Sequence, residues 1–347
     1  MARKLLWASL ALAPITFLVD VAFHPGDVAL FALAALSLVP LARLIGEATE
    51  HAGEHTGPGI GGFLNASFGN APELIIALVA IGDSLPDVVR GSLAESVISN
   101  VLLVLGVAIV AQGGAEGELD RRSLRVQLAL IGGAVLLLLI PAVPGFHGDP
   151  NRHSLALVTT PVAVALLVAY VWVTTLNLRR HRAGHDDEAK SEAWPLKTAL
   201  AALIAATAAT AVVSEILVHS LEAFAHAAHL SEFFISAVIV ALVGNAAEHG
   251  GAIVIANRGK IKLATEIAVA SGAQVALFVM PAVALLSWLV TPALTFAFRP
   301  AELIAMALAV AAVAVVLHDA RARRAEGAAL ITLYGAVVVA FLLAGDR

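Results

Sequence analysis

Long apolar runs separated by short polar stretches dominate the chain. Because about 20 apolar residues in a helix span a bilayer, each run of that length predicts a transmembrane helix. Eleven such runs lie near 5–23, 27–46, 60–82, 88–111, 124–143, 154–176, 196–217, 231–255, 262–290, 300–317 and 328–344. Within the ninth run a turn is expected around Ser287–Pro292. The pattern predicts an all-α integral membrane protein with 11 transmembrane helices.

Lys and Arg are divided unequally between the predicted loops, and this division predicts the orientation of the chain. Seventeen of the 21 lie on the side of the N-terminus. The other side has Arg90, Arg152, Arg299 and Arg347. Because cytoplasmic loops carry the excess of positive charge, we expect a cytoplasmic N-terminus and an external C-terminus, in a prokaryotic cell membrane.

A polar segment at 177–195 divides the chain into two halves of five helices each. It separates an N-terminal helix (1–26) and a first unit (27–176) from a second unit (196–347). Since five is odd, the two units have opposite orientations, which is the inverted-repeat architecture of secondary transporters. A single offset of 175 residues relates polar positions inside the apolar runs. It maps Glu47 to Glu222, Asn70 to Asn245, Glu73 to Glu248, Ser96 to Ser271 and Ser99 to Gln274.

The composition agrees with a helical membrane protein and excludes several other classes. Of the 347 residues, 60% are hydrophobic and 14% are charged, whereas about a quarter are charged in a soluble domain. The residue pattern favours packed helices over a β-barrel of short alternating strands. No basic block predicts nucleic-acid binding, and the absence of Cys excludes disulfides and thiolate metal sites. Residues 1–23 are interpreted as a retained helix because no signal-peptide cleavage site stands out after them.

The stretch Gly-Asn-Ala-Pro-Glu at 69–73 recurs as Gly-Asn-Ala-Ala-Glu at 244–248. In each copy the Asn and the Glu are three residues apart and share one helix face. A carboxylate at bilayer depth is costly without a partner, an ion or water, so each Glu predicts a functional site. The alternative is that these side chains only cross-link helices through hydrogen bonds, although such links do not require duplication at matched depth.

Oxygen-bearing side chains around the two copies predict a site for a hard divalent cation. The expected site residues are Glu73, Glu248, Asn70, Asn245, Ser96, Ser99, Ser271 and Gln274. Pro72 is expected to disturb the preceding turn and to free carbonyl oxygens. Two carboxylates among oxygen ligands suit Ca²⁺ better than Mg²⁺ or Zn²⁺. Without the cation the two carboxylates repel each other and favour proton uptake, so the cation and protons compete for one site.

Three further polar residues near this site have roles that the sequence leaves open. Glu95 has no counterpart at the offset of 175, and it is interpreted either as a third site carboxylate or as a pore-lining acid. Asn100 is an accessory candidate on the same segment. His249 follows Glu248 on another helix face, and it is interpreted either as a proton carrier or as a packing partner, but not as a metal ligand.

Charged and imidazole side chains at helical spacing flank the predicted site on both sides of the membrane. They are Glu47, Glu50 and Glu54 on the cytoplasmic side, and Glu222, His226 and His229 outside. One interpretation is an acidic funnel that concentrates cations inside and an external vestibule that senses or relays protons. The other is that both groups are solvated ends of amphipathic helices.

These motifs resemble those of the calcium/proton antiporters, the cation-exchanger family of the calcium/cation antiporter superfamily. The first motif is similar to the family's Gly-Asn-Ala-Thr-Glu-Leu and the second to its Gly-Asn-Ala-Ala-Glu-His-Ala-Gly-Ala-Ile. Further similar stretches are 46–50, 91–92, 99–106 and 271–277. The resemblance implies eleven helices, export of cytosolic Ca²⁺ driven by inward proton movement, and Glu73 and Glu248 as central ligands. Pro72, Gly250 and Glu95 depart from the family's pattern, and Glu95 leaves the charge of the site open.

The predicted function is therefore alternating-access exchange, with Ca²⁺ as transported substrate, protons as counter-ion, no cofactor and no enzymatic activity. A sodium/calcium exchanger of the same superfamily is the main alternative, but Asn70 and Asn245 supply neutral amides where such exchangers carry more carboxylate and hydroxyl oxygens. An intramembrane metal-dependent hydrolase would need an open metal position and usually several His ligands. A passive channel does not require an inverted pair of carboxylates. The sequence predicts contact with the lipid bilayer, but neither the oligomeric state nor the proton number.

Overall fold

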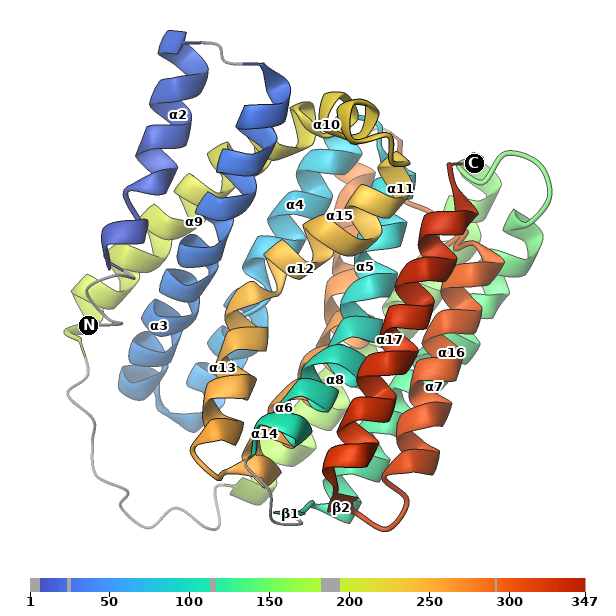
Figure 1. Cartoon of the computed structure of the whole chain (residues 1–347). Coiled ribbons are helices and arrows are strands. Elements are labelled where there is room, and N and C mark those ends of the chain that lie inside the picture. The colour runs from blue at the N-terminus through green and yellow to red at the C-terminus, as the bar shows by residue number, and fades with distance from the viewer. Residues whose placement is uncertain (1–6, 24–25, 113–116, 182–193, 291, 347) are drawn as a thin grey trace.

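The computed structural model describes residues 7–23, 26–112, 117–181, 194–290 and 292–346. Within these ranges the regular secondary structure is helical except for a short antiparallel pair of strands, β1 (Gly117–Glu118) and β2 (Arg321–Ala322) (Figure 1). In the first half the helices are α2 (Leu12–Phe23), α3 (Asp27–Phe68), α4 (Ala71–Gly82), α5 (Pro86–Ser99), the π-helical η1 (Asn100–Val104), α6 (Leu105–Ala111), α7 (Arg121–Gly145) and α8 (His153–His181). The prediction of an all-helical chain is confirmed.

The second half has the same character. Its helices are α9 (Leu196–His219), α10 (Leu221–Ala228), α11 (Glu232–Phe234), the π-helical η2 (Ile235–Val240), α12 (Ala241–Gly244), α13 (Ala246–Asn257), α14 (Ile261–Gln274), the π-helical η3 (Val275–Val279), α15 (Met280–Leu286), the 3₁₀ turn η4 (Ser287–Leu289), α16 (Pro300–Val316) and α17 (Arg324–Ala344). The turn predicted within the ninth run is present as η4. Most of the predicted linker at 177–195 lies outside the described residues, but α8 continues to His181 and therefore past its expected end.

Seven helices of the described chain are long and apolar enough to cross a membrane, and an eighth span results if the pair α10 and α11–α12, bent by 112°, is counted as one. Three shorter apolar helices cover Trp7–Phe23, Ala71–Gly82 and Pro300–Val316. The boundaries differ from the prediction in the first half. The runs 27–46 and 60–82 were expected as two helices, whereas α3 continues to Phe68 and a separate helix, α4, follows. The polar residues after 46 keep helical spacing, so they extend α3 instead of ending it.

Both motif-bearing segments are broken at their Asn residue. Helix α3 ends at Phe68 and α4 begins at Ala71, and in the second half α12 ends at Gly244 and α13 begins at Ala246. Pro72 lies in the first turn of α4, where a missing backbone N–H is tolerated. The second copy breaks at the same place without a proline. The expected effect of Pro72 is therefore insufficient to explain the break, which both copies share.

The element boundaries repeat along the chain with the offset found in the sequence. Each boundary of α4, α5, η1 and α6 lies 175 residues before the corresponding boundary of α13, α14, η3 and α15. The two π-helical turns η1 and η3 are part of this correspondence. Single π-helical turns inside α-helices occur frequently at functional sites, and both of these directly follow the segments that carry Ser96, Ser99, Ser271 and Gln274.

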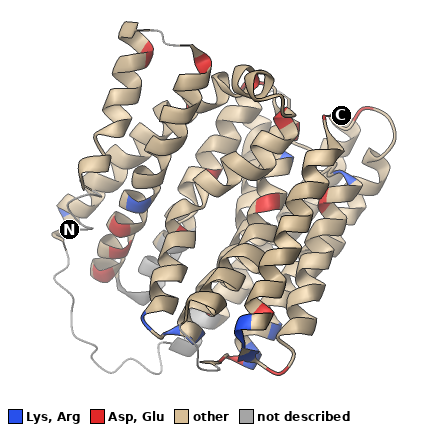
Figure 2. Ribbon diagram, in the orientation of Figure 1, with Lys and Arg blue, Asp and Glu red and all other residues tan. Residues whose placement is uncertain are grey.

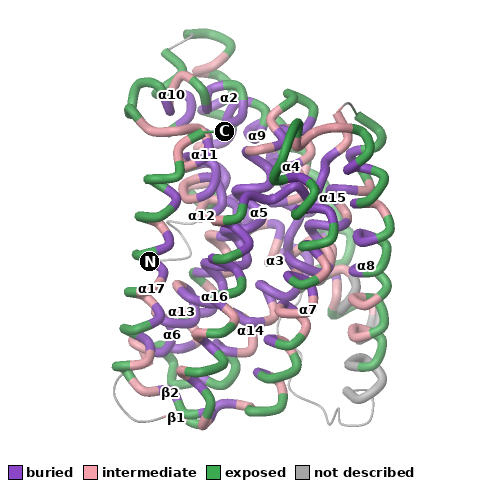
Figure 3. The backbone as a smooth tube through the Cα atoms, turned by 90° about the vertical axis from the view of Figure 1, so that its right-hand side faces the viewer, coloured by how far each residue is buried: buried purple, intermediate pink, exposed green. Residues whose placement is uncertain are grey.

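Burial separates central helices from peripheral ones. In the most apolar 18 residues of the span Pro86–Ala111, 83% are buried inside the protein, whereas in those of His153–Leu176 and Arg324–Ala344 the share is 28%. Figure 3 shows the buried stretches gathered around α5 and α12, with exposed residues along α8. Figure 2 shows much of the Lys and Arg near the end of the molecule that holds β1 and β2. The central helices therefore surround the motifs, and the peripheral helices present apolar surface outward.

Candidate functional site

Each motif places its Asn at a helix break and its Glu in the first turn of the following helix. Asn70 precedes α4 and Asn245 precedes α13, and Glu73 and Glu248 follow in the first turns of these helices. The N-terminal end of a helix carries partial positive charge that favours a carboxylate. The last carbonyl groups of a helix generally lack intrahelical donors, and at the second break the Ala241 carbonyl accepts from both the backbone N–H and Nδ2 of Asn245. Side-chain and backbone oxygens therefore meet at each break.

The two carboxylates approach each other from opposite halves of the chain. Glu248 lies close enough to Glu73 for the charges of the two carboxylates to interact. Glu73 also packs against the second motif, since a Cβ atom added to Gly244 would lie 3.4 Å from Glu73 Cγ. Glu73 is 6% exposed and Glu248 is half-buried. Glycine at position 244 therefore provides the space that lets the first carboxylate lie beside the second motif.

Hydrogen bonds of the two Asn side chains cross between the halves. Asn70 Nδ2 donates to Gln274 Oε1 at 3.1 Å. Asn245 Nδ2 donates to Ser96 Oγ at 2.7 Å, and Asn245 Oδ1 accepts from Asn100 Nδ2 at 3.3 Å. Each motif is thus held by the helix that follows the other motif, and residues about half the chain apart lie in one cluster.

Two serines complete the polar cluster. Ser271 is a hydrogen-bonding neighbour of the Glu248 carboxyl. The Ser99 hydroxyl donates to the Ser96 carbonyl at 3.4 Å and also lies beside the Glu95 carboxyl. All eight predicted site residues therefore lie on α4, α5, α13, α14 and the breaks before α4 and α13. Their role in binding a cation stays a prediction.

Several acceptor oxygens in this cluster have no hydrogen-bond partner among the described residues. They are Oε1 and Oε2 of Glu73, Oε2 of Glu248 and Oδ1 of Asn100. Buried polar atoms are normally paired, so these oxygens are suited to a cation or to protons. In the described part of the chain, no group of three or more His, Cys, Asp and Glu side chains is placed to share one metal ion. The cluster accordingly combines a pair of carboxylates with neutral oxygen donors.

The three accessory candidates differ in their surroundings. Asn100 belongs to the cluster through its bond to Asn245. Glu95 is 1% exposed and its Oε1 accepts a hydrogen bond from Tyr334 Oη at 2.6 Å. His249 is 8% exposed, and its Nε2 has no hydrogen-bond partner among the residues that the structure describes. Its two sequence-based interpretations both remain predictions.

The flanking groups lie on α3 and at α10. Glu50 and Glu54 are exposed and Glu47 is half-buried on α3, whereas Glu222 and His226 on α10 and His229 after it are exposed. His229 has a left-handed backbone conformation, with φ of 56°, where α10 ends. Figure 1 shows α10 at one end of the molecule, while α3 runs toward the other. Their roles as funnel and vestibule stay predictions.

An aromatic contact on α3 was not predicted. The ring of His51 stacks on Trp194, with ring centroids 4.7 Å apart, and His55 Nε2 lies 2.7 Å from the Trp194 carbonyl oxygen. Trp194 in turn lies beside Trp7, at 5.9 Å between centroids. A Trp that begins a membrane helix after a polar linker is a weak signal for such a contact, because tryptophan is common at membrane interfaces in general.

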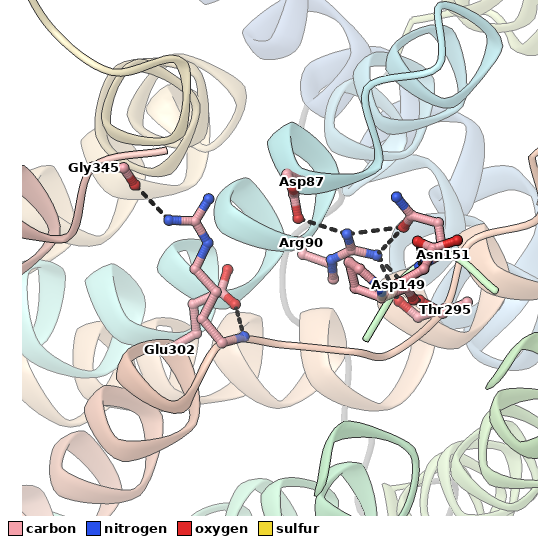
Figure 4. Close-up of polar contacts among 9 residues, drawn as sticks. Asp87, Arg90, Asp149, Asn151, Thr295, Glu302 and Gly345 are labelled. Atoms are coloured by element: carbon pink, nitrogen blue, oxygen red, sulfur yellow. Dashed lines mark hydrogen bonds and ion pairs between the residues drawn. The ribbon is translucent and has the colours of Figure 1, made fainter. Parts of the chain in front are cut away.

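A buried arginine at the start of α5 was also not predicted. Arg90 is 1% exposed and donates to Asp87 at 2.6 Å, to Asn151 at 3.0 and 3.1 Å, and to Thr295 Oγ1 at 3.1 Å (Figure 4). It therefore joins α5, the loop before α8 and the extended segment before α16. The sequence showed Arg90 only as one of four charges on the outer side, because its partners are 61 and 205 residues away.

Comparisons with known proteins agree on one family. The family model described as sodium/calcium exchanger protein matches residues 27–179 and 198–343. The Ca(2+)/H(+) antiporter ChaA of Bacillus subtilis is 35% identical over 329 residues, 92% of this chain and 93% of that protein. A Ca(2+)/H(+) antiporter of Aphanothece halophytica is 32% identical over 339 residues, 92% and 91% of the two chains. The solved structure of native YfkE matches with a TM-score of 0.84 and 32% identity, over 97% and 99% of the two chains.

These matches confirm the resemblance found in the motifs. They cover both halves of the chain and nearly the full length of the relatives, so the similarity is that of a whole protein. The protein is an integral multi-pass membrane transporter, not an enzyme, and its family requires no cofactor. The chain belongs to the sodium/calcium exchanger protein family.

Proposed function

We propose that this protein exchanges cytosolic Ca²⁺ for external protons by alternating access. The observation that carries the proposal is the pair of carboxylates, Glu73 and Glu248, contributed by two broken helices and set beside each other. Three of their four oxygens have no hydrogen-bond partner among the described residues. The names of the two curated relatives, both Ca²⁺/H⁺ antiporters, support the choice of ions.

The charge of the two carboxylates explains why Ca²⁺ and protons replace each other in the cluster. With Ca²⁺ bound, two carboxylates balance the charge of the ion, and the neutral oxygens of the Asn, Gln and Ser side chains with backbone carbonyls complete its six to eight ligands. Without Ca²⁺, two bare carboxylates in a buried cluster repel each other and lack solvation, so protons replace the cation. Both loaded forms are close to neutral. A carrier whose site is neutral in either form can switch the access of that site from one side of the membrane to the other.

The proposed topology is eleven spans in an N-terminal helix, 1–26, and two inverted units, 27–176 and 196–347. The long helices, the bent pair and the three short apolar helices together number eleven. The offset of 175 residues between helix boundaries in the two halves supports a repeat. An odd number of spans in each unit gives the inversion. The excess of Lys and Arg on one side supports a cytoplasmic N-terminus and an external C-terminus in a prokaryotic cell membrane.

Ca²⁺ flux into proteoliposomes under an imposed pH gradient tests this function. The wild type is expected to accumulate Ca²⁺ in response to the proton gradient alone, whether or not Na⁺ is present. Glu73→Gln and Glu248→Gln are expected to lose the flux, and Glu266→Gln, a swap on α14 outside the cluster, serves as the matched control. Exchange that persists in both variants of the pair would refute the assignment.

The Na⁺ arm of the same experiment addresses the main alternative. Asn70 and Asn245 lie at the centre of the cluster as neutral amides, and a carrier of several Na⁺ ions would be expected to place more charged or hydroxyl oxygens there. Uptake that requires a Na⁺ gradient and ignores the pH gradient would identify a sodium/calcium exchanger instead.

A further inference from the structure

Glu95 is a buried carboxyl group that the proposed exchange does not use. It lies on α5 next to Ser96, which belongs to the cation cluster, and its Oε2 is buried with no hydrogen-bond partner among the described residues. A carboxylate in this position is close enough in the chain to become a third ligand. The structure instead shows its Oε1 accepting a hydrogen bond from Tyr334 Oη at 2.6 Å.

The hydroxyl of Tyr334 is brought to Glu95 by a close helix contact. Helix α17 crosses α6 at Gly327 and Gly106, where a Cβ atom added to Gly106 would lie 2.8 Å from the Gly327 carbonyl oxygen. Such small-residue contacts let helix backbones approach closely in membranes. Tyr334 lies two turns after Gly327 on the same helix face. The backbone contact therefore fixes the place of the phenol, which is itself buried.

Charged side chains on the surrounding elements do not fix the position of the Glu95 carboxyl group. Tyr334 is not the sole ionisable residue near Glu95. The others on α5, on the elements packed against α5 and on α17 are Asp87, Arg90, Glu73, Glu232, Lys262, Glu266, Glu302, Arg324 and Glu326. None of the described residues forms an ion pair with Glu95, and the polar groups that act on its carboxyl are Tyr334 and Ser99. Arg90, the cation on the same helix as Glu95, donates hydrogen bonds to Asp87, Asn151 and Thr295.

We infer that Tyr334 is a positioning residue that restrains the Glu95 carboxyl at α17 and thereby limits the exchange site to two carboxylates. The hydrogen bond forms whether or not Glu95 carries a proton, because both forms of a carboxyl group accept from a phenol. Ser99, a member of the cluster, already lies beside the Glu95 carboxyl, and loss of the phenol oxygen frees the side chain to turn further into the cluster. A third carboxylate there strengthens cation binding and slows release, since ligand charge sets the affinity of oxygen sites for Ca²⁺.

This inference rests on the proposed function for its consequence in transport, so its primary test is equilibrium binding of Ca²⁺ to purified protein in detergent. Tyr334→Phe is expected to tighten Ca²⁺ binding by about tenfold, and in flux measurements to lower KM and kcat together. Glu95→Gln in the same chain, the double variant, is expected to restore wild-type affinity. Tyr170→Phe, which changes the chain's other tyrosine, is the matched control.

Two results would overturn the inference. Wild-type affinity in Tyr334→Phe would show that the phenol does not restrain a ligand. A changed affinity that persists in the double variant would show that Tyr334 acts through packing and not through Glu95. Failure of the proposed function gives a different pattern, because wild-type protein would then bind Ca²⁺ without proton-driven flux, or would not bind it at all.

Discussion

The pair of Glu73 and Glu248 and the buried Glu95 differ in their surroundings. The pair of Glu73 and Glu248 lies at two helix breaks, and three of its four oxygens lack a hydrogen-bond partner among the described residues. Glu95 lies within an unbroken helix, and a tyrosine hydroxyl holds one of its oxygens at 2.6 Å. Burial alone therefore does not make a carboxylate part of an ion site. Glu95 also has one oxygen, Oε2, without a partner among the described residues, so what distinguishes the pair is that two carboxylates lie beside each other at helix breaks, among neutral side-chain oxygens.

Neutralising either member of the pair is expected to have the largest effect. Removing one partner from a buried set of opposite charges costs about 3 kcal/mol or more. Applied to the free energy of Ca²⁺ binding, this is about a 100-fold loss in affinity. We therefore expect Glu73→Gln and Glu248→Gln each to lower Ca²⁺ binding by at least that factor, as measured by titration of purified protein. Wild-type Ca²⁺ affinity in either variant would show that this carboxylate is not a ligand and would contradict the contrast with Glu95.

Removing a cross-link between the halves is expected to have the next largest effect. Asn245→Ala deletes the bonds to Ser96 and Asn100 and leaves both groups buried without that partner. An unsatisfied buried polar group costs about 1–3 kcal/mol, so flux in proteoliposomes is expected to fall by about tenfold. Asn151→Ala, which removes a half-buried amide from the Arg90 cluster, is the comparison variant. A larger loss of flux in Asn151→Ala than in Asn245→Ala would contradict the assignment.

The close contact of α6 with α17 can be tested through stability. In Gly106→Ala the new methyl group would meet the Gly327 carbonyl oxygen at 2.8 Å and Ile331 Cγ1 at 2.9 Å. Overpacking of this kind costs about 1–3 kcal/mol, and thermal unfolding of the purified protein is expected to begin at lower temperature. Gly132→Ala, whose Cβ would lie 3.7 Å from Val310 Cγ1, is the control. Equal thermal stability in the two variants would show that the contact is loose.

Neutralising Glu95 is expected to change transport far less than neutralising the pair. Glu95→Gln keeps the shape of the side chain and an acceptor for Tyr334, so the contact between α5 and α17 survives. We expect its Ca²⁺ affinity to fall by less than about tenfold, the scale on which ligand charge and rigidity tune such sites. A loss as large as that of Glu73→Gln would place Glu95 among the ligands.

A half-buried carboxylate outside the predicted membrane spans, Asp120, is expected to give the smallest effect. Asp120 caps α7 by accepting from the backbone N–H groups of Arg122 and Ser123. The bond from Ser123 N–H, with help from Lys262, holds the pKa of Asp120 below its ordinary value. A lowered pKa stabilises the fold above the unfolded pKa of about 3.9, and this contribution disappears as the pH falls through the folded pKa.

Asp120→Ala is therefore expected to cost about 1 kcal/mol at neutral pH, as is typical of a lost helix cap. Thermal unfolding measured at neutral and at acid pH checks this effect. The difference between the variant and the wild type should shrink below pH of about 3.9. A difference that stays constant across this range would mean that the charge of Asp120 does not contribute.

Much of the fold was predictable because it depends on periodic patterns. Apolar runs predicted an all-helical membrane protein, and the repeat at an offset of 175 recurs in the boundaries of α4 and α13. The boundary within α3 was wrong, because hydropathy does not register a helix that continues through polar residues such as Glu47 and Glu50. The break before α13 was unexpected, because Ala247 stands where Pro72 gives the first copy a visible signal.

The site was predictable where it repeats and not where it depends on distant contacts. Asn70 and Gln274 are 204 residues apart, but the offset relates each to a partner in the other half and so pointed to both. Tyr334 and Glu95 are 239 residues apart and have no repeated counterpart as a pair. Hydrophobic periodicity cannot reveal such a contact, because Tyr334 lies in an otherwise apolar run.

The most direct test of the central claim is to count the protons that the purified protein releases when Ca²⁺ binds in weakly buffered detergent solution. If Glu73 and Glu248 hold either Ca²⁺ or protons, the wild type releases protons as it binds Ca²⁺, and the release ends when the site is saturated. Glu73→Gln, measured alongside, is expected to show neither binding nor release. Tight Ca²⁺ binding without proton release in the wild type would contradict competition at this site, and with it the proposed exchange.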